Sequence, residues 1–223
     1  MEKDLHKLFT PPADIPRDYE HYFENEKRFI ELMMMYQCAI REVSTKFKVL
    51  NDEMTVRNNR NPIEAIKTRV KSPISIVNKL KRRGFEISLD SVEKNLNDVA
   101  GVRIICSFID DIYYIVKLFT NQDDIRVIEI KDYIKNPKEN GYRSYHMIIE
   151  IPVFFSCEKK YMRVEVQIRT MAMDFWASLE HQVRYKKDIE NSNAIGEKLK
   201  ECADVIADAD VKMLDIAKQI NII

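Results

Sequence analysis

The sequence predicts an α/β (α+β) fold, with a β-rich centre between long helices at the two ends of the chain. Three observations support this class. Residues 19–51 and 194–220 carry apolar side chains at spacings near three and four, the period of an amphipathic helix. Residues 161–170 (YMRVEVQIRT) alternate strictly between apolar and polar, the period of a half-buried strand. Apolar residues make up 45% of the chain and charged residues 32%, as in soluble globular proteins.

Charge and cysteine usage narrow the class further. The 36 basic and 36 acidic residues cancel, so the total charge does not favour non-specific binding to DNA or to an anionic membrane. The N-terminus lacks the apolar segment of a signal peptide, and no run approaches the ~20 apolar residues of a membrane-spanning helix. Four separated cysteines without a CxxC pair indicate reduced thiols, with Cys106 and Cys202 in packed positions. We therefore expect a cytoplasmic protein.

The elements are predicted in order along the chain. Residues 1–17 contain three prolines and are expected to form a flexible tail, with residues 18–223 as one domain. The first long helix carries one apolar stripe, formed by Ile30, Met33, Met34, Ile40, Val43, Phe47 and Leu50. Residues 58–62 break that pattern. The segment 66–83 is interpreted as one that begins the next helix, which runs from Ser72 to Gly84. Further helices are predicted at 88–96, 110–120, 171–187 and 194–220, and strands at 99–107, 125–130, 144–154 and 161–170.

Local signals support several of these boundaries. Ser72 followed by proline is an N-cap signal, and Gly84 after a basic cluster suits a helix C-terminus. The segment SCEKK turns the third strand back into the fourth as a hairpin. The last helix has a stripe formed by Ile195, Leu199, Cys202, Ile206, Ala209, Met213 and Ile220. This stripe could cover the protein's own sheet or pair with another subunit.

The polar face of residues 161–170 is the first candidate site. It presents one carboxylate, Glu165, between two guanidinium groups, Arg163 and Arg169, and the amide of Gln167. Such a face is either an ordinary solvated side of a sheet or the floor of a cleft for a metal and a polyanion.

A second candidate lies around the helix that begins at Ser72. Lys71 precedes the helix, where cations and backbone N–H groups can together hold phosphate, and Lys79 follows within it. Arg69 could stack on a flat ring. The alternative is a solvated lysine-rich face.

The segment LNDVAGVRIIC contains a third candidate. Asp98 before a buried strand is either a turn residue or a ligand for Mg²⁺. Gly101 would allow close approach of a ligand or a neighbouring chain segment. Arg103 among apolar residues must pair or contact a ligand, since a buried unpaired charge is costly.

The loop KNPKENGYRSYH contains the fourth candidate. Gly141 permits a tight turn, and Tyr142 behind it can stack on a nucleobase, worth roughly 1–3 kcal/mol. Lys138, Arg143 and His146 could contact phosphate or ribose oxygens. Alternatively, the tyrosines of this hairpin-entry loop pack on the sheet. In the following helix, His181 is interpreted as a surface or supporting residue, because no HExxH motif accompanies it.

These segments together resemble the synthetase domain of the RelA/SpoT family, and more closely its stand-alone members, the small alarmone synthetases. The resemblance spans residues 69–187 and rests on five motifs in the same order. They are RVKSPISIVNK, NDVAGVRI, NGYRSYH, VEVQIRT and WASLEH.

The resemblance implies a nucleotidyltransferase-like synthetase fold, with a mixed sheet of about five strands flanked by helices. It implies pyrophosphate transfer from ATP to the 3′-hydroxyl of GDP or GTP, giving ppGpp or pppGpp and AMP. The larger relatives carry a hydrolase domain with a His–Asp motif, and this sequence contains no His-Asp dipeptide. Synthesis without hydrolysis is therefore expected. A homotetramer is also implied, with no membrane or DNA partner and with RNA left open as a regulator.

The resemblance also assigns roles to matching residues. For ATP, Arg69 and Arg103 would sandwich the adenine, and Lys71, Ser75 and Lys79 would hold the phosphates. For GDP or GTP, Tyr142 would stack on guanine, with Lys138, His146 and Gln167 near the acceptor. Asp98 and Glu165 would be the catalytic pair and would hold Mg²⁺.

Two points stay open at this stage. Glu165 is either the base for the attacking hydroxyl or a residue that positions it, since the flanking Arg163 and Arg169 would stabilise its charged form. Arg184 stands where some relatives have Asn, which leaves the guanine contacts open. The alternative function is a non-catalytic guanine-nucleotide or RNA sensor on the same fold. A nucleotidyltransferase acting on RNA is a third hypothesis, but its paired acidic residues near a Gly–Ser turn are not found.

Overall fold

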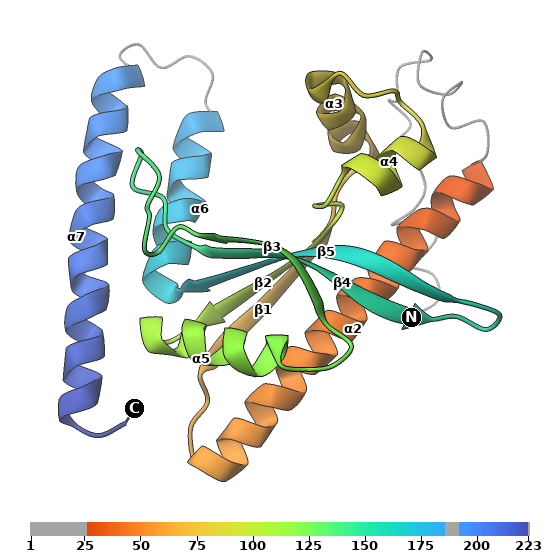
Figure 1. Ribbon diagram of the computed structural model, residues 1–223. Coiled ribbons are helices and arrows are strands. Elements are labelled where there is room, and N and C mark those ends of the chain that lie inside the picture. Colours follow the sequence, from red (N-terminus) through yellow and green to blue (C-terminus); the bar gives the residue numbers. More distant parts are fainter. Residues whose placement is uncertain (1–25, 186–191, 223) are drawn as a thin grey trace.

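A five-stranded mixed sheet forms the centre of the molecule (Figure 1). The computed structural model describes residues 26–185 and 192–222, so the predicted tail at 1–17 lies outside the described residues. The strand order is β1–β2–β5–β4–β3, and β2 and β5 are the parallel pair. The predicted fold class, a mixed sheet of about five strands with helices, is confirmed. The strands are β1 (Ile63–Val70), β2 (Ala100–Cys106), β3 (Arg126–Asp132), β4 (Tyr145–Phe154) and β5 (Lys159–Thr170).

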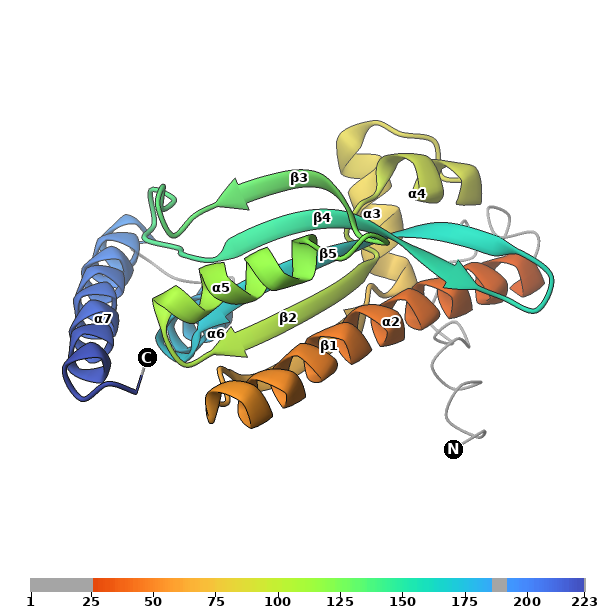
Figure 2. The ribbon, with the colours of Figure 1, turned by 60° about the horizontal axis from the view of Figure 1, so that its bottom comes forward.

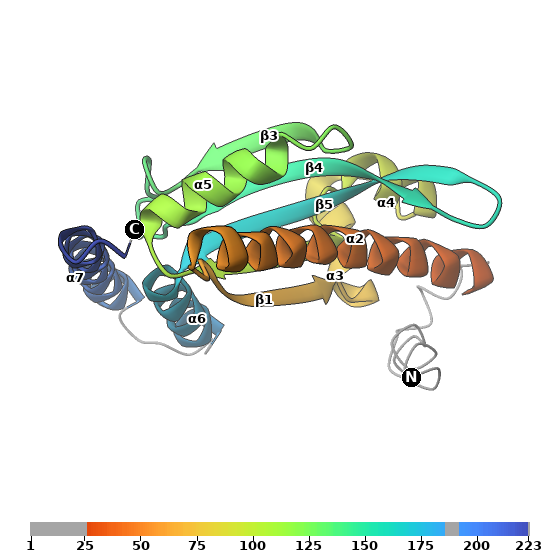
Figure 3. The same cartoon turned by 90° about the horizontal axis from the view of Figure 1, so that it is seen from below.

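Two helices cover one face of this sheet (Figure 3). They are α2 (Glu26–Asn58) and α5 (Ile109–Thr120). The predicted stripe of α2 faces the sheet, and its Phe47 stacks on Phe119 of α5 with ring centroids 4.3 Å apart. Burial of such side chains is the main stabilising term of the domain, at about 1.5–3 kcal/mol for each large apolar residue.

The other face of the sheet is flanked by helices at its two ends. Near the end of β1 stand α3 (Pro73–Arg83) and α4 (Leu89–Asn95), and at the opposite end α6 (Met171–Tyr185) follows β5 directly. The last helix, α7 (Ser192–Gln219), packs along α6. Figure 1 shows α3, α4 and α6 rising on the same side of the sheet, and Figure 2 shows the β4–β5 hairpin extending beyond α4. The sheet face between these helices is therefore left for a site.

The predicted caps of α3 are confirmed. The Ser72 hydroxyl accepts a hydrogen bond from the Ser75 N–H at 3.3 Å, and Pro73 is the first helical residue. Gly84 ends the helix at φ 71°, in the left-handed region where glycine carries no steric cost. This helix start places Lys71 and Ser75 at one end of the open sheet face.

The first strand was not predicted. Residues 66–71 were assigned to a segment that begins a helix, whereas Ile63–Val70 forms β1, antiparallel to β2. The reason is its place at the sheet edge, where most of its side chains are half-buried or exposed. An edge strand of this kind shows little apolar alternation in its sequence.

The buried stripe of α7 also differs from the prediction. Its packed residues are Ala203, Ala207, Asp210, Leu214 and Ala217. Cys202 is exposed, as are Ala209, Met213 and Ile220 of the predicted stripe, while Ile195, Leu199 and Ile206 are half-buried. The alanines allow α7 to lie close to its neighbours, which the larger apolar side chains would prevent. Cys106 is buried as predicted, and all four thiols are free. Among the described helices, none is long and apolar enough to cross a bilayer.

Candidate active site

Strand register brings five of the predicted site residues into two adjacent rows across the open sheet face: Arg69, Arg103, His146, Glu165 and Gln167. One row runs from Arg69 through Gly101 to Glu165. The other joins Lys67, Arg103, Gln167, His146 and Lys131. Side chains in such rows share a face of the sheet, because each strand alternates with a period of two. The rows therefore combine residues that are up to about one hundred positions apart in sequence.

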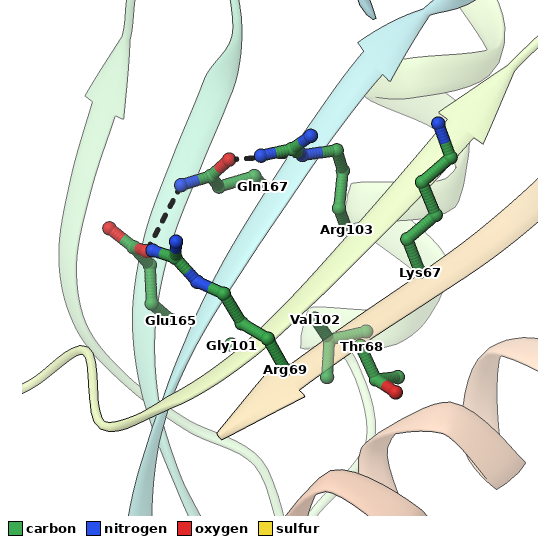
Figure 4. Close-up of a pocket in the computed structure, with 8 residues that line it drawn as sticks. All are labelled: Lys67, Thr68, Arg69, Gly101, Val102, Arg103, Glu165 and Gln167. Carbon is green, nitrogen blue, oxygen red and sulfur yellow. Dashed lines mark hydrogen bonds between the residues drawn. The ribbon is translucent and has the colours of Figure 1, made fainter. Parts of the chain in front are cut away.

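An open pocket lies over β1, β2 and β5, the first three strands of these rows (Figure 4). It is lined by Lys67, Thr68, Arg69, Gly101, Val102, Arg103, Glu165 and Gln167. A Cβ added at Gly101 would lie 3.4 Å from Cγ of Arg69. The close approach predicted at Gly101 is therefore made by the Arg69 side chain, which lies across the strand at this point.

Arg103 pairs as the sequence required. Its Nη1 donates to Oδ1 of Asp174 at 3.2 Å, and its Nε donates to Oε1 of Gln167 at 3.3 Å. The side chain stays about 30% exposed and lines the pocket. One edge of the guanidinium is thus fixed, and the group still faces the pocket together with Arg69.

Asp98 binds both lysines predicted for phosphate. Nζ of Lys71 and Nζ of Lys79 each lie 2.5 Å from its Oδ2. Burial opposes ionisation of Asp98, but these two hydrogen bonds outweigh it and hold the pKa of the carboxyl below its usual range. Burial lowers the pKa of Lys79, and Asp98 opposes that shift. Ser75 is exposed in the first turn of α3 beside this cluster.

The second oxygen of Asp98 bears on the expected metal. Its Oδ1 is buried and has no hydrogen-bond partner in the described structure. A hard cation such as Mg²⁺ takes carboxylate oxygens as ligands, so this oxygen fits the expected role. Glu165 lies on the neighbouring strand, in register with Gly101, three residues beyond Asp98. The described residues contain no cluster of three or more metal-ligating side chains, so any metal would keep most of its water or take substrate oxygens.

Glu165 is half-buried, and beside it lie a hydrogen-bond donor, Gln167, and an imidazole, His146. Nε2 of Gln167 donates to its Oε2 at 3.0 Å, and Nδ1 of His146 lies 4.0 Å from its Oε1. The expectation that the flanking arginines stabilise this carboxylate directly is not supported by the pairing. Arg163 donates to Glu150 and Asn97, and Arg169 points to other acceptors.

The loop before β4 places the residues predicted for the acceptor. Gly141 has φ 85° and its N–H donates to the Lys138 carbonyl at 2.8 Å, which confirms the tight turn. Tyr142 is half-buried, and its ring packs against the small cluster around Trp176. Nζ of Lys138 lies 4.9 Å from the centroid of the Tyr142 ring. The Tyr142 ring is therefore partly exposed, and the Lys138 ammonium lies close to it.

His146 is neutral in this environment. Burial, reinforced by the positive charges of Arg169 and Lys138, lowers its pKa to about 3. Its Nε2 lies 2.8 Å from the hydroxyl of Tyr142. His146 thus contacts both the predicted guanine platform, Tyr142, and the predicted catalytic carboxylate, Glu165.

Asp174 was not predicted as a site residue, and Arg169 was named on the polar face of residues 161–170 without a binding or catalytic role. Arg169 is only 4% exposed and Asp174 is 6% exposed, and they pair at 3.2 Å. Asp174 also accepts from Lys67 at 2.7 Å. Arg169 stands on the predicted polar face of β5, so its alternation was a usable signal. The part played by Asp174 depends on how the chain turns from β5 into α6, which no local pattern reveals.

The residues singled out on α6 are only partly described. His181 is exposed on α6, in agreement with its interpretation as a surface residue. Glu180 accepts a hydrogen bond from Nδ2 of Asn140 at 3.2 Å, which connects α6 to the loop of Tyr142. The side chain of Arg184 lies outside the described residues.

Comparisons with known proteins agree on one family. A family model described as "Region found in RelA / SpoT proteins" matches residues 68–190. GTP pyrophosphokinase YwaC of Bacillus subtilis is 46% identical over 189 residues, which cover 85% of this chain and 90% of that protein.

Solved structures give the same result. The small alarmone synthetase 1 from Bacillus subtilis, in a crystal structure with its product pppGpp, has a TM-score of 0.78 and 33% identity, covering 86% of this chain and 98% of that one. A crystal structure of that synthetase bound to AMPCPP has a TM-score of 0.73 and 29% identity, covering 87% and 98%.

Proposed function

The chain belongs to the RelA/SpoT family, and from this premise we propose that it is a GTP pyrophosphokinase. It transfers the β,γ-pyrophosphate of ATP to the 3′-hydroxyl of GDP or GTP, giving ppGpp or pppGpp and AMP. One observation carries the proposal: a pocket lined by Arg69 and Arg103 opens beside Glu165, and the loop of Tyr142 borders the same sheet face. A donor site, an acceptor site and a carboxylate between them are what this reaction requires.

The donor half of the site binds ATP. Arg69 and Arg103 line one pocket, and their flat guanidinium groups suit the two faces of an adenine ring. Lys71, Ser75 and Lys79 stand at the start of α3, where backbone N–H groups add to the attraction for phosphate. When phosphate binds, the two lysines exchange part of their contact with Asp98 for phosphate oxygens.

The acceptor half binds GDP or GTP. Guanine stacks on Tyr142 and takes the place that the Lys138 ammonium occupies at its ring. The displaced ammonium, with its positive charge, then neutralises an acceptor phosphate. His146 and Gln167 lie between this ring and Glu165 and contact the ribose side of the nucleotide.

Catalysis consists mainly of positioning and charge neutralisation. The 3′-oxygen attacks the β-phosphorus of ATP in line, the bond from that phosphorus to the oxygen bridging the α-phosphate breaks, and AMP leaves with that oxygen. Glu165 accepts a hydrogen bond from the 3′-hydroxyl and orients it, and the proton passes to this carboxylate or to water. The lysines at α3 stabilise the charge that develops on the transferred phosphates.

Mg²⁺ is the expected cofactor, with Asp98 and Glu165 as its protein ligands. The unpartnered Oδ1 of Asp98 supports this assignment. When bound, the ion supplies neutralisation of phosphate charge, as divalent cations do in phosphoryl-transfer enzymes generally. We further propose a cytoplasmic homotetramer. The exposed apolar residues of α7 support a subunit contact, which sedimentation velocity of the purified chain would test.

Incubation of the protein with ATP, GDP and Mg²⁺ tests the function. AMP and a more highly charged guanine nucleotide should form in equal amounts, separable by anion-exchange chromatography. Glu165→Gln should reduce turnover at least 100-fold, as loss of a positioned catalytic group does. Glu158→Gln, on the exposed β4–β5 turn, is the matched control and should keep full activity. Folded protein that forms no AMP would refute the proposal.

The second candidate is a guanine-nucleotide or RNA sensor without catalysis. It is favoured only by the present pairing of Asp98 with two lysines, which occupies one oxygen of this carboxylate. Calorimetric binding of GDP or RNA without product would support it. A companion assay with ppGpp and Mn²⁺ should show no release of pyrophosphate if the enzyme only synthesises.

A further inference from the structure

The buried guanidinium of Arg169 stands at the centre of the hydrogen bonds that join the two halves of the site. Its Nε donates to Oγ of Ser144 at 3.3 Å, and its Nη1 donates to Oδ1 of Asp174 at 3.2 Å. Its Nη2 donates to the Tyr142 hydroxyl at 2.6 Å and to Oε1 of Gln167 at 3.0 Å. Arginine can only donate, so every one of these oxygens must accept.

The first consequence concerns the amide of Gln167. Its Oε1 accepts from Arg169 at 3.0 Å and from Arg103 at 3.3 Å. With the carbonyl oxygen held between two arginines, the NH₂ group must point the other way, toward Glu165. Figure 4 shows Gln167 between Arg103 and Glu165, with its hydrogen bonds to these two residues drawn. A flipped amide would set its carbonyl oxygen against the carboxylate and its NH₂ group against two cations.

The second consequence concerns the imidazole of His146. The Tyr142 oxygen accepts from Arg169, which can only donate, and among the described residues the other partner of this hydroxyl is Nε2 of His146, 2.8 Å away. The single hydrogen of the hydroxyl is therefore directed at Nε2. Nε2 then carries no hydrogen, and in a neutral ring the hydrogen must be on Nδ1. That nitrogen faces Oε1 of Glu165 at 4.0 Å. The other tautomer would direct a lone pair at the carboxylate.

We propose that Arg169 is a positioning residue that orients both neutral neighbours of Glu165: the amide of Gln167, which donates to the carboxylate, and the imidazole of His146, whose Nδ1–H faces it at 4.0 Å. Arg169 thus acts on the catalytic carboxylate without touching it, through its hydrogen bonds to Gln167 and to Tyr142. Arg169 and Arg103 also share two acceptors, Asp174 and Gln167, so the same buried group ties the acceptor half to the donor half. This inference deepens the proposed function and rests on it.

The tautomer of His146 is the direct readout. In long-range ¹⁵N–¹H correlation spectra of the wild-type protein near pH 7, His146 should show a protonated Nδ1 and an unprotonated Nε2. The signal is assigned by its loss in His146→Gln. Arg169→Lys keeps the positive charge but loses the planar set of guanidinium N–H donors, so both tautomers of His146 should appear. An Nε2–H tautomer in the wild type, or an unchanged one in Arg169→Lys, would overturn the inference.

Kinetics supply the second readout. Arg169→Lys should lower kcat about 100-fold, the scale expected for a misplaced catalytic group, while the KM for ATP changes less than about threefold. The matched control is Arg60→Lys, since Arg60 forms another buried ion pair, with Asp111, on the far side of the sheet. It should lower the melting temperature without changing kcat or the tautomer.

Tyr142→Phe provides an independent test if Arg169→Lys does not fold. It removes the hydroxyl between Arg169 and His146 but keeps the ring, so the tautomers should mix while the KM for GDP stays within about threefold. Preserved tautomer in Tyr142→Phe would contradict the inference. An inactive wild type would instead refute the proposed function, and the spectra would still decide whether Arg169 sets the tautomer.

Discussion

Two clusters of the site, around Asp98 and around Asp174, each place several cations around one carboxylate, but they do so in opposite ways. In the donor half, Lys71 and Lys79 share one oxygen of Asp98, and the other oxygen has no partner. Around Asp174, by contrast, Lys67 takes one oxygen and two arginines take the other. The first cluster has a coordination position left open, and the second is saturated.

This difference teaches how the protein separates binding from positioning. Lysine ammonium groups are point charges on flexible stems and can turn from a carboxylate to a phosphate at small cost. An arginine guanidinium that donates to several fixed acceptors keeps those acceptors in place, because a displacement of the buried guanidinium breaks several hydrogen bonds at once. The Asp98 cluster is therefore built to exchange partners, and the Asp174 cluster is built to keep them.

The largest expected effect on stability is at Asp174, and its substitution tests directly whether the saturated cluster is structural. Asp174→Asn leaves two arginines and Lys67 without their counter-charge, and it should lower the free energy of unfolding by about 3 kcal/mol. Urea denaturation measures this change. Asp204→Asn, an exposed partner of Lys200 on α7, should change stability by less than about 0.5 kcal/mol. Equal losses in both variants would mean that the saturated cluster is not a structural centre.

Gly141 and Gly101 show the same contrast between a fixed and an adaptable environment, because an added Cβ at Gly141 meets a packed helix and one at Gly101 meets a flexible side chain. Gly141→Ala forces a side chain onto φ 85° and into overlap with Cβ of Ala203, so stability should fall by about 1–3 kcal/mol. Gly101→Ala meets the flexible Arg69 side chain at 3.4 Å and the Arg69 carbonyl oxygen at 3.8 Å, both ordinary contact distances, so it should cost less stability while raising the KM for ATP. Thermal unfolding of the pair, with Gly196→Ala on α7 as the control in open space, tests the order.

The buried imidazole makes the acceptor half sensitive to acid. The pKa of His146 is lowered to about 3, well under the ~6.5 of an unfolded histidine. The folded protein gains stability from the neutral ring above about pH 6.5 and loses it as the pH falls toward 3, by up to about 1.4 kcal/mol per pH unit. His146→Gln should flatten this slope in urea denaturation measured from pH 7 to 4. An unchanged slope would place the acid sensitivity elsewhere.

The smallest effect on stability is expected in the exchangeable cluster. In Lys79→Ala, Lys71 still pairs with Asp98, so unfolding free energy should change by no more than about 1 kcal/mol. The KM for ATP should rise about tenfold, because one phosphate contact is lost. Arg82→Ala, an exposed cation on the same helix, should leave the KM unchanged. A large loss of stability in Lys79→Ala would remove the contrast between the two clusters.

The sequence predicted those elements whose burial leaves a regular pattern. The α2 stripe and the central strands were found because one face of each is buried. β1 was missed since an edge strand has little apolar alternation, although its Arg69 and Lys67 line the pocket. The stripe of α7 was misplaced because alanines, which pack most closely there, carry a weak hydrophobic signal.

The site residues likewise fall into those that the sequence predicted and those that it missed. Motif order brought Arg69, Arg103, Glu165 and Gln167 together, and the pocket contains all four. The buried Arg169 was noticed only as a neighbour of Glu165, because a polar face does not reveal which of its members is covered by a helix. Asp174 had no signal at all, since its role depends on α6 folding back beside β2.

The parallel pairing of β2 with β5 has a consequence for the order of assembly. These strands carry Arg103 and Glu165, yet α5, β3 and β4 lie between them in the chain. Pairing them closes a long loop, which is entropically costly and slow compared with forming a hairpin. A nascent chain that ends before β5 lacks Glu165 and Gln167, which line the pocket. The pocket over β1, β2 and β5 can therefore be completed only after residue 170 has been synthesised and has joined the sheet.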